Sequence, residues 1–358
     1  FEGSPSFLEY ALLDGSTDEV INNWSVFDAD PQNGESTLRI ELAPTSETAT
    51  YKIAVRFGDD VSVVDTDTKT FTLGDKLLSF GQSLAYHMRT VGSVPALNGY
   101  MQFNGSYPSA TSSGRGDYET AKVIIDSDGV AVQILNVAVG SSPLMYDGDS
   151  ENWLNENSNL WQDLVSGMDA FIGDDNRIAG AYWQQGHTDY VYGRTESEYL
   201  TALNTLMSRL RTAYKGADGD ELPLYVATQG RNVPEAGTPT GKQGIRNALL
   251  SFIAQNNKVT HVPVYASELT DTVHSTESAY AIVGREIGLK HLDNRGSISL
   301  KAPAVNRVEI NDERNELTLT YDSLLDTAIT PYSTEGVRVD FGGTSYAIES
   351  YQNIDDST

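Results

Sequence analysis

The sequence contains no cysteine, few basic residues and no long hydrophobic run. The lack of cysteine excludes disulfide frameworks, thiolate metal ligands and a cysteine nucleophile. The apolar runs are only a handful of residues long, far short of the roughly 20 that a membrane-spanning helix needs. The sequence therefore predicts a chain without disulfide bonds and without a transmembrane helix.

The charge balance is strongly acidic. Lysine and arginine number 24 against 50 aspartate and glutamate residues, which gives a formal net charge of −26. A field of this sign repels phosphate backbones and anionic lipid, so we expect no nucleic acid and no membrane as partner. The balance suits a protein that works in salt, outside a cell, or on uncharged or weakly charged substrates.

The 358 residues divide into three parts by their hydrophobic patterns. Residues 1–74 show period-two alternation between turn signals, which predicts an N-terminal β domain that resembles a sandwich. Residues 75–294 alternate short apolar runs with amphipathic helical segments, which predicts a three-layer α/β/α domain with a parallel sheet. Residues 295–358 return to strand patterns and predict a C-terminal β domain.

Within the central part, the predicted elements have specific bounds. The predicted strands are Leu77–Phe80, Ala131–Val139, Ile178–Trp183, Leu222–Ala227 and Val259–Ala266. One helix carries a capping box, Thr195 with Glu198, and we expect it to end at Gly216. Further helices are predicted to begin near Ser83, Asn159, Gly241 and Ser275.

Polar residues follow four of these strands, where the functional sites of parallel sheets form. The four blocks are Gly81-Gln82-Ser83, Gly140-Ser141-Ser142, Gln184-Gln185-Gly186-His187 and Asp271-Thr272-Val273-His274. Together they offer a hydroxyl, free amides and an Asp-x-x-His pair. These are the groups that acyl transfer requires.

A serine hydroxyl is a weak nucleophile and needs an adjacent base. We expect Ser83 to be the nucleophile, His274 to take its proton, and Asp271 to orient the imidazole. The backbone amides of Ser83 and Gly140 and the side-chain amide of Gln185 are the predicted oxyanion hole. This chemistry uses no cofactor, and we expect no metal ion.

These four blocks, in this order, resemble those of the SGNH hydrolases, and more narrowly those of the sialate O-acetylesterase-like carbohydrate esterases. The resemblance covers residues from about 75 to 294. It implies removal of acetyl groups from a carbohydrate, with Ser83, His274 and Asp271 in the roles given above. Two positions depart from the family pattern, because His187 stands where Glu is frequent and Ser141 stands where a second Gly is usual.

The substrate side of the site is predicted from aromatic residues in polar stretches, since flat rings suit the apolar faces of sugars. The residues concerned are Tyr100, Phe103, Tyr107, Tyr118, Trp153, Trp161, Tyr190 and Tyr192. We expect Gln82, His187, Trp153 and Tyr190 to contact an acetylated polysaccharide or glycan. Such a substrate implies an extracellular protein, either secreted or on the surface of a bacteriophage tail. A homo-oligomer is possible in principle, and a tail protein would be a trimer.

Each of these residues also has a purely structural interpretation. Ser83 and His274 can cap helices, Asp271 can belong to a turn, and Gln185 and Gly140 can serve local packing. His87, His261 and His291 are interpreted as ordinary structural histidines. At the level of the whole chain, two alternatives stay open: a glycan-binding or structural module without turnover, and a short-chain esterase acting on a non-carbohydrate ester.

Overall fold

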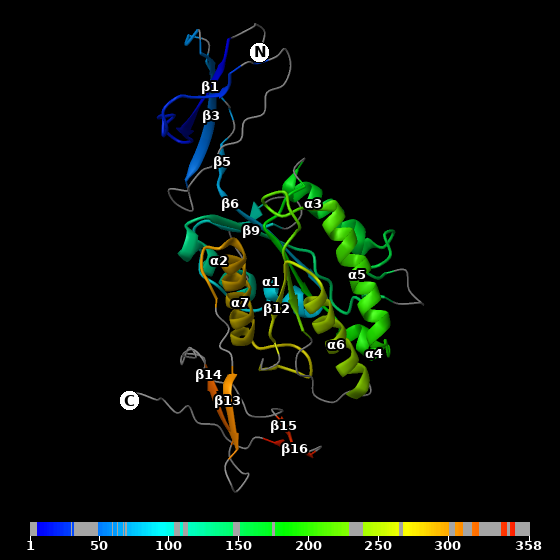
Figure 1. Ribbon diagram of the computed structural model, residues 1–358. Coiled ribbons are helices and arrows are strands. Elements are labelled where there is room, and N and C mark those ends of the chain that lie inside the picture. Colours follow the sequence, from blue (N-terminus) through cyan, green and yellow to red (C-terminus); the bar gives the residue numbers. More distant parts are fainter. Residues whose placement is uncertain are drawn as a thin grey trace, which may run out of the picture.

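The computed structural model describes residues 6–29, 31, 49–58, 60–62, 64–66, 68, 70–103, 108–109, 114–145, 151–173, 176–228, 239–264, 268–300, 305–310, 317–321, 338–341 and 344–347. An antiparallel sheet comes first, a layered α/β unit follows, and pairs of strands come last (Figure 1). This order of elements agrees with the order predicted from the sequence, while the domain boundaries themselves stay predictions. No helix in these ranges is long and apolar enough to cross a membrane.

The N-terminal sheet has five antiparallel strands in the order β2-β1-β3-β4, with β5 paired to β3. Its strands are β1 (Leu8–Asp14), β2 (Ser25–Asp28), β3 (Thr50–Phe57), β4 (Val64–Thr66) and β5 (Phe71–Thr72). Alternate residues Ala11, Leu13 and Ala54 are buried together on one face. The described residues form one sheet here, so the second layer of a sandwich stays a prediction.

The central sheet has seven strands in the order β12-β11-β10-β6-β9-β7-β8. Its strands are β6 (Gly74–Gly81), β7 (Tyr100–Phe103), β8 (Pro108–Ser109), β9 (Ala131–Asn136), β10 (Gly180–Gln184), β11 (Leu224–Ala227) and β12 (Val259–Val262). All neighbours are parallel except β7 and β8. This arrangement confirms the predicted parallel sheet.

Helices cover both faces of this sheet, which confirms the three-layer prediction (Figure 1). Helices α1 (Ser83–Thr90), α2 (Arg115–Asp128) and α7 (Glu277–Arg295) pack on one face. Helices α3 (Asn159–Ile172), α5 (Glu196–Ala213) and α6 (Pro239–Gln255) pack on the other, and the short α4 (His187–Val191) follows β10.

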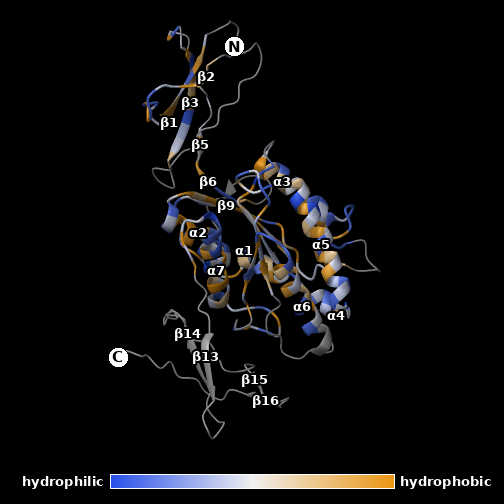
Figure 2. Cartoon of the chain, in the orientation of Figure 1, coloured by the Kyte–Doolittle hydropathy of each residue, from blue (hydrophilic) through white to orange (hydrophobic). Residues whose placement is uncertain are grey.

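Alternation along the strands directs side chains into the two layers, because successive residues of a strand point to opposite faces. Leu77 and Tyr182 pack against the first group of helices, whereas Leu78 and Trp183 pack against the second. The helices turn their apolar sides toward the sheet and their polar sides outward (Figure 2). Burial on both faces explains why these strands appear in the sequence as short continuous apolar runs.

Two sequence predictions about secondary structure were wrong. The polar stretch that carries Tyr100, Phe103 and Tyr118 was predicted to face substrate, but it contains β7 and the start of α2, and these three aromatic residues belong to the core. The polar sequence at the start of α2 masked its helical period, and Tyr107 lies outside the described residues. Helix α5 has the predicted capping box but ends at Ala213, because Tyr214 takes up an extended conformation before Gly216 is reached.

The C-terminal strands pair as two antiparallel hairpins, β13 with β14 and β15 with β16. Their bounds are β13 (Val305–Ile310), β14 (Leu317–Tyr321), β15 (Arg338–Phe341) and β16 (Thr344–Ala347). Strands therefore occur where the alternating sequence pattern predicts them.

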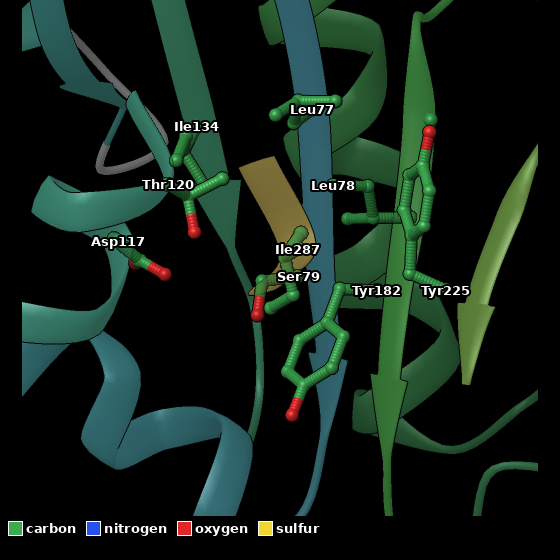
Figure 3. A pocket seen from close by; sticks show the side chains of 10 residues that line it. Leu77, Leu78, Ser79, Asp117, Thr120, Ile134, Tyr182, Tyr225 and Ile287 are labelled. Carbon is green, nitrogen blue, oxygen red and sulfur yellow. The ribbon is translucent and has the colours of Figure 1, made fainter. Parts of the chain in front are cut away.

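A small cavity lies between the central sheet and helices α2 and α7, and one carboxyl group faces it (Figure 3). That group is Asp117 of α2, which is 3% exposed and accepts a hydrogen bond from Asn136 Nδ2 at 3.3 Å. Burial raises its pKa to about 7, against the opposing effects of the Asn136 hydrogen bond and the Arg89 charge. The folded chain therefore holds a proton that the unfolded chain releases at lower pH, so this carboxyl destabilises the fold as pH rises from about 4 to 7.

We expect the substitution Asp117→Asn to stabilise the protein at pH 8, by up to roughly 4 kcal/mol, and to have little effect at pH 4. The amide of asparagine has the shape of the neutral, protonated carboxyl group and cannot ionise. Urea unfolding at both pH values measures the difference, with the exposed Asp163→Asn as a control. An equal change in the free energy of unfolding at the two pH values would contradict this account.

Candidate active site

The four polar blocks meet at one edge of the central sheet. They follow β6, β9, β10 and β12, whose carboxyl ends share that edge because the strands are parallel. Strand β6 lies between β9 and β10, and the chain adds later strands on opposite sides of it. Such a reversal of strand order opens a crevice beyond the strand ends, where ligands bind in open α/β sheets.

Ser83 is placed by a sharp turn between β6 and α1. Gly81 makes this turn at a φ of 127°, and a Cβ at this position would lie only 2.3 Å from the carbonyl oxygen of Gln184. Glycine is therefore required here both for its conformation and for the close approach of β10. The turn leaves Ser83 half-buried as the first residue of α1.

His274 lies beside Ser83 although the two are far apart in sequence. Its Nε2 is 3.0 Å from Ser83 Oγ, and its Nδ1 is 2.7 Å from Asp271 Oδ2. The other carboxylate oxygen, Asp271 Oδ1, accepts hydrogen bonds from the backbone amides of Val273 and His274, each at 2.7 Å. The hydroxyl, the imidazole and the carboxylate thus form one continuous hydrogen-bonded chain.

The surroundings of Asp271 favour its ionised form, which can act as a negatively charged partner for the His274 imidazole. Partial burial is the largest single influence and would raise its pKa, but the hydrogen bonds from the backbone and ring of His274 and from Val273 together outweigh it. The pKa of Asp271 therefore falls to about 2. The carboxyl is negatively charged across the whole range in which an imidazole titrates.

The loop that carries these two residues is tied to itself and to α7. Leu269 and Ser275 form an antiparallel bridge, and the Thr270 amide donates to the His274 carbonyl at 2.8 Å. Thr276 then caps α7 through the amide of Ala279. These contacts hold the Asp-x-x-His turn at the helix entrance.

Two of the three predicted oxyanion donors lie together. The Ser83 amide opens α1, where a helix leaves its first N–H groups without intrahelical acceptors. Gly140 lies alongside, because a Cβ at Gly140 would be 4.0 Å from the Cβ of Ser83. The two residues therefore lie side by side, and the role of their backbone amides as donors to an oxyanion stays a prediction.

The third predicted donor, Gln185, uses its side chain in internal hydrogen bonds. Its side-chain amide donates to the Ser142 carbonyl at 3.2 Å and to the carboxylate of Asp189, and its oxygen accepts from Tyr199 at 2.7 Å. Both amide hydrogens are used and the residue is buried, so the structure contradicts its place in the oxyanion hole. Gln185 instead joins β10 to the segment that follows Gly140.

Three of the four predicted substrate contacts are also internal. Gln82 is buried, and its Oε1 accepts hydrogen bonds from the amides of Gly186, His187 and Thr188, so it caps α4. Trp153 is 0% exposed and donates to Ser142 Oγ at 3.0 Å, and Tyr190 is buried in the same core. Only His187, which is half-buried at the start of α4, keeps a substrate contact as a prediction.

Sequence reasoning missed two residues that support the site. Asn136, at the end of β9, donates to the carbonyl of Ala85 in α1 at 2.9 Å, and its own carbonyl accepts from Arg89 at 2.7 Å. His87, interpreted as an ordinary histidine, has its ring centroid 4.5 Å from that of His274. Its spacing of four residues from Ser83 on a helix was the one available signal.

The described part of the chain holds no group of three or more His, Cys, Asp or Glu residues arranged to bind a metal ion.

Comparison with known proteins points to one family. A family model described as "Carbohydrate esterase, sialic acid-specific acetylesterase" matches residues 109–292, just over half of the chain. The matched range contains Gly140, Gln185, Asp271 and His274, and it begins after Ser83. No curated protein matches the sequence.

Among solved structures similar to this chain, the first one shows the same fold. The chain is similar to a carbohydrate acetylesterase from Xanthomonas citri, with 16% identity and a TM-score of 0.54 over 89% of this chain and 76% of that one. A carbohydrate acetylesterase from Sinorhizobium meliloti has 16% identity and a TM-score of 0.40, over 60% of this chain and 97% of that one. A family two carbohydrate esterase from Clostridium thermocellum, solved in complex with cellohexaose, has 11% identity and a TM-score of 0.43, over 82% and 91% of the respective chains.

The central α/β unit thus has the SGNH hydrolase fold expected from the four blocks. Because its family model covers more than half of the residues, the chain belongs to the carbohydrate esterase, sialic acid-specific acetylesterase family.

Proposed function

We propose that this carbohydrate O-acetylesterase removes acetyl groups from an acetylated glycan, with polysaccharide as the preferred form, through an acyl-enzyme on Ser83. The observation that carries this proposal is the 3.0 Å contact between Ser83 Oγ and His274 Nε2. The family match supports an acetylated carbohydrate as the substrate class. The acidic charge of the chain favours an extracellular setting, which is part of the proposal.

In the first half of the reaction, Ser83 Oγ attacks the acetyl carbonyl while its proton moves to His274 Nε2. Asp271, ionised and bonded to Nδ1, stabilises the imidazolium that forms. The carbonyl oxygen becomes an oxyanion that accepts hydrogen bonds from the amides of Ser83 and Gly140. The oxyanion then re-forms the carbonyl as the bond between the acetyl carbon and the sugar oxygen breaks, and the imidazolium gives its proton to that oxygen, which leaves as the sugar hydroxyl.

The second half repeats this path with water as the nucleophile. His274 takes a proton from water, whose oxygen attacks the acetyl carbonyl on Ser83. Collapse of the second oxyanion breaks the ester and returns the proton to Ser83 Oγ. Acetate leaves, and the serine and the neutral imidazole are restored.

We expect Ser83→Ala to reduce acetate release by at least about 10³-fold, because it removes the hydroxyl that lies within hydrogen-bonding distance of His274 Nε2. The measurement compares acetate release from an aryl acetate and from an acetylated glycan, with a chelator present throughout. Ser166→Ala on the exposed side of α3 is the matched control and should retain native rates. Equal rates for the native chain and Ser83→Ala would refute the proposal.

Replacing the carboxylate tests the orienting role. We expect Asp271→Asn to lower kcat roughly 10- to 100-fold, less than loss of the imidazole, because the Asp271 side chain is 53% exposed and solvent replaces part of its charge. With the pKa of Asp271 at about 2, its ionisation does not limit the native enzyme above pH 4. A pH–rate profile from 4 to 9 that contains a carboxylate ionisation abolished by Asp271→Asn would contradict this assignment.

The two alternatives give different results in the same assays. A glycan-binding module without turnover would bind acetylated polysaccharide but release no acetate at any pH. A non-carbohydrate esterase would prefer acyl chains well beyond acetyl in a chain-length series. The proposed enzyme prefers acetyl and releases acetate from glycans.

A further inference from the structure

His87 is the titratable side chain that lies against the proposed catalytic base. It comes one helical turn after Ser83 on α1, so both side chains project from the same side of the helix. The rings of His87 and His274 have centroids 4.5 Å apart and planes inclined by 44°. The His274 imidazole therefore has Asp271 at one nitrogen, Ser83 at the other, and a second ring packed against it.

His87 itself is anchored from another element. Its Nδ1 lies 3.3 Å from the hydroxyl of Tyr280, a buried residue of α7. The ring of Tyr86, its neighbour on α1, has its centroid 5.9 Å from that of His87. The His87 ring is thus held by α1 and α7, whereas His274 comes from a partly exposed turn.

The two hydrogen bonds of His274 leave one motion poorly restrained. Contacts at Nδ1 and Nε2 fix the ends of the ring, but they allow its plane to tilt about the line between them. The Asp271 side chain is 53% exposed and that of His274 is 28% exposed, so solvent reaches this turn. A ring packed against the imidazole opposes the tilt and keeps Nε2 directed at Ser83 Oγ.

The charge state of His87 is compatible with this role. Its pKa is lowered, mainly by burial and further by the charge of His274, while Asp271 opposes the change. The groups that face it are His274 and Asp271 from the turn, Tyr280 from α7 and Tyr86 from its own helix. A neutral ring tolerates the imidazolium that forms during the reaction, whereas a second cation would repel it.

We propose that His87 is a positioning residue, whose ring packs against His274 and holds the imidazole in the plane that directs Nε2 at Ser83 Oγ. This inference rests on the proposed function, since it concerns the base of that reaction. It predicts that the ring of His87 matters more to turnover than its hydrogen bond to Tyr280.

Three variants of the full-length chain separate these properties. His87→Phe keeps a ring but cannot bond to Tyr280, His87→Gln keeps a polar group without a ring, and His87→Ala has neither. We expect His87→Phe to stay within about threefold of native kcat, and His87→Gln and His87→Ala to lose about 10- to 100-fold, the cost of a small misplacement of a catalytic group. KM for an aryl acetate should change less than twofold in all three.

Thermal melting of each variant controls for unfolding. Ser83→Ala, measured alongside, distinguishes failure of the positioning role of His87 from failure of the proposed esterase function. If native turnover depends on Ser83 but His87→Ala and His87→Gln both match native kcat, the positioning role is wrong and the proposed function stands. Loss of activity in His87→Phe equal to that in His87→Ala, with native melting, also overturns it. If Ser83→Ala matches the native chain, the proposed function itself fails.

Discussion

The proposed esterase chemistry depends on one hydrogen bond, between Ser83 Oγ and His274 Nε2 at 3.0 Å. The two residues stand 191 positions apart, and no local preference of the chain brings them together. The sheet does so, because parallel strands place the ends of β6 and β12 at one edge. Gly81 gives the turn after β6 its shape, and the capped start of α7 holds the turn that carries His274. The apolar layers on both faces of the sheet are what keep this edge in place.

The sequence predicted the positions of the candidate site residues correctly where those residues follow the end of a strand and lie at or before the start of the next helix. Ser83, Asp271 and His274 were predicted as a triad from their places after apolar runs, and the structure brings them within hydrogen-bonding distance of one another. Gly140 was predicted as an oxyanion donor, and it lies beside Ser83. The parallel sheet was predicted from the alternation of short apolar runs with amphipathic helical segments, a pattern that local sequence carries well.

Prediction from the sequence was wrong where a polar or aromatic side chain could point either into the active site or into the core. Gln82 and Gln185 belong to two of the four blocks, and Trp153 lies in a polar stretch that was predicted to contact substrate. Their side chains instead turn inward to cap α4, to bridge β10 to Ser142, and to fill the core. Which way such a residue points depends on tertiary hydrogen-bond partners that no spacing encodes. The same reason explains why His87 was taken for an ordinary histidine, since its partners come from the turn after β12 and from α7.

The central claim is that the acetyl group is carried by Ser83. The most direct measurement is mass spectrometry of the chain quenched during turnover of an acetylated glycan, followed by peptide mapping. The account predicts one acetyl group per chain, located on Ser83 and absent when His274 is replaced by Ala. Acetate release at the native rate with no acetyl group on Ser83, or with the acetyl group on another residue, would contradict it.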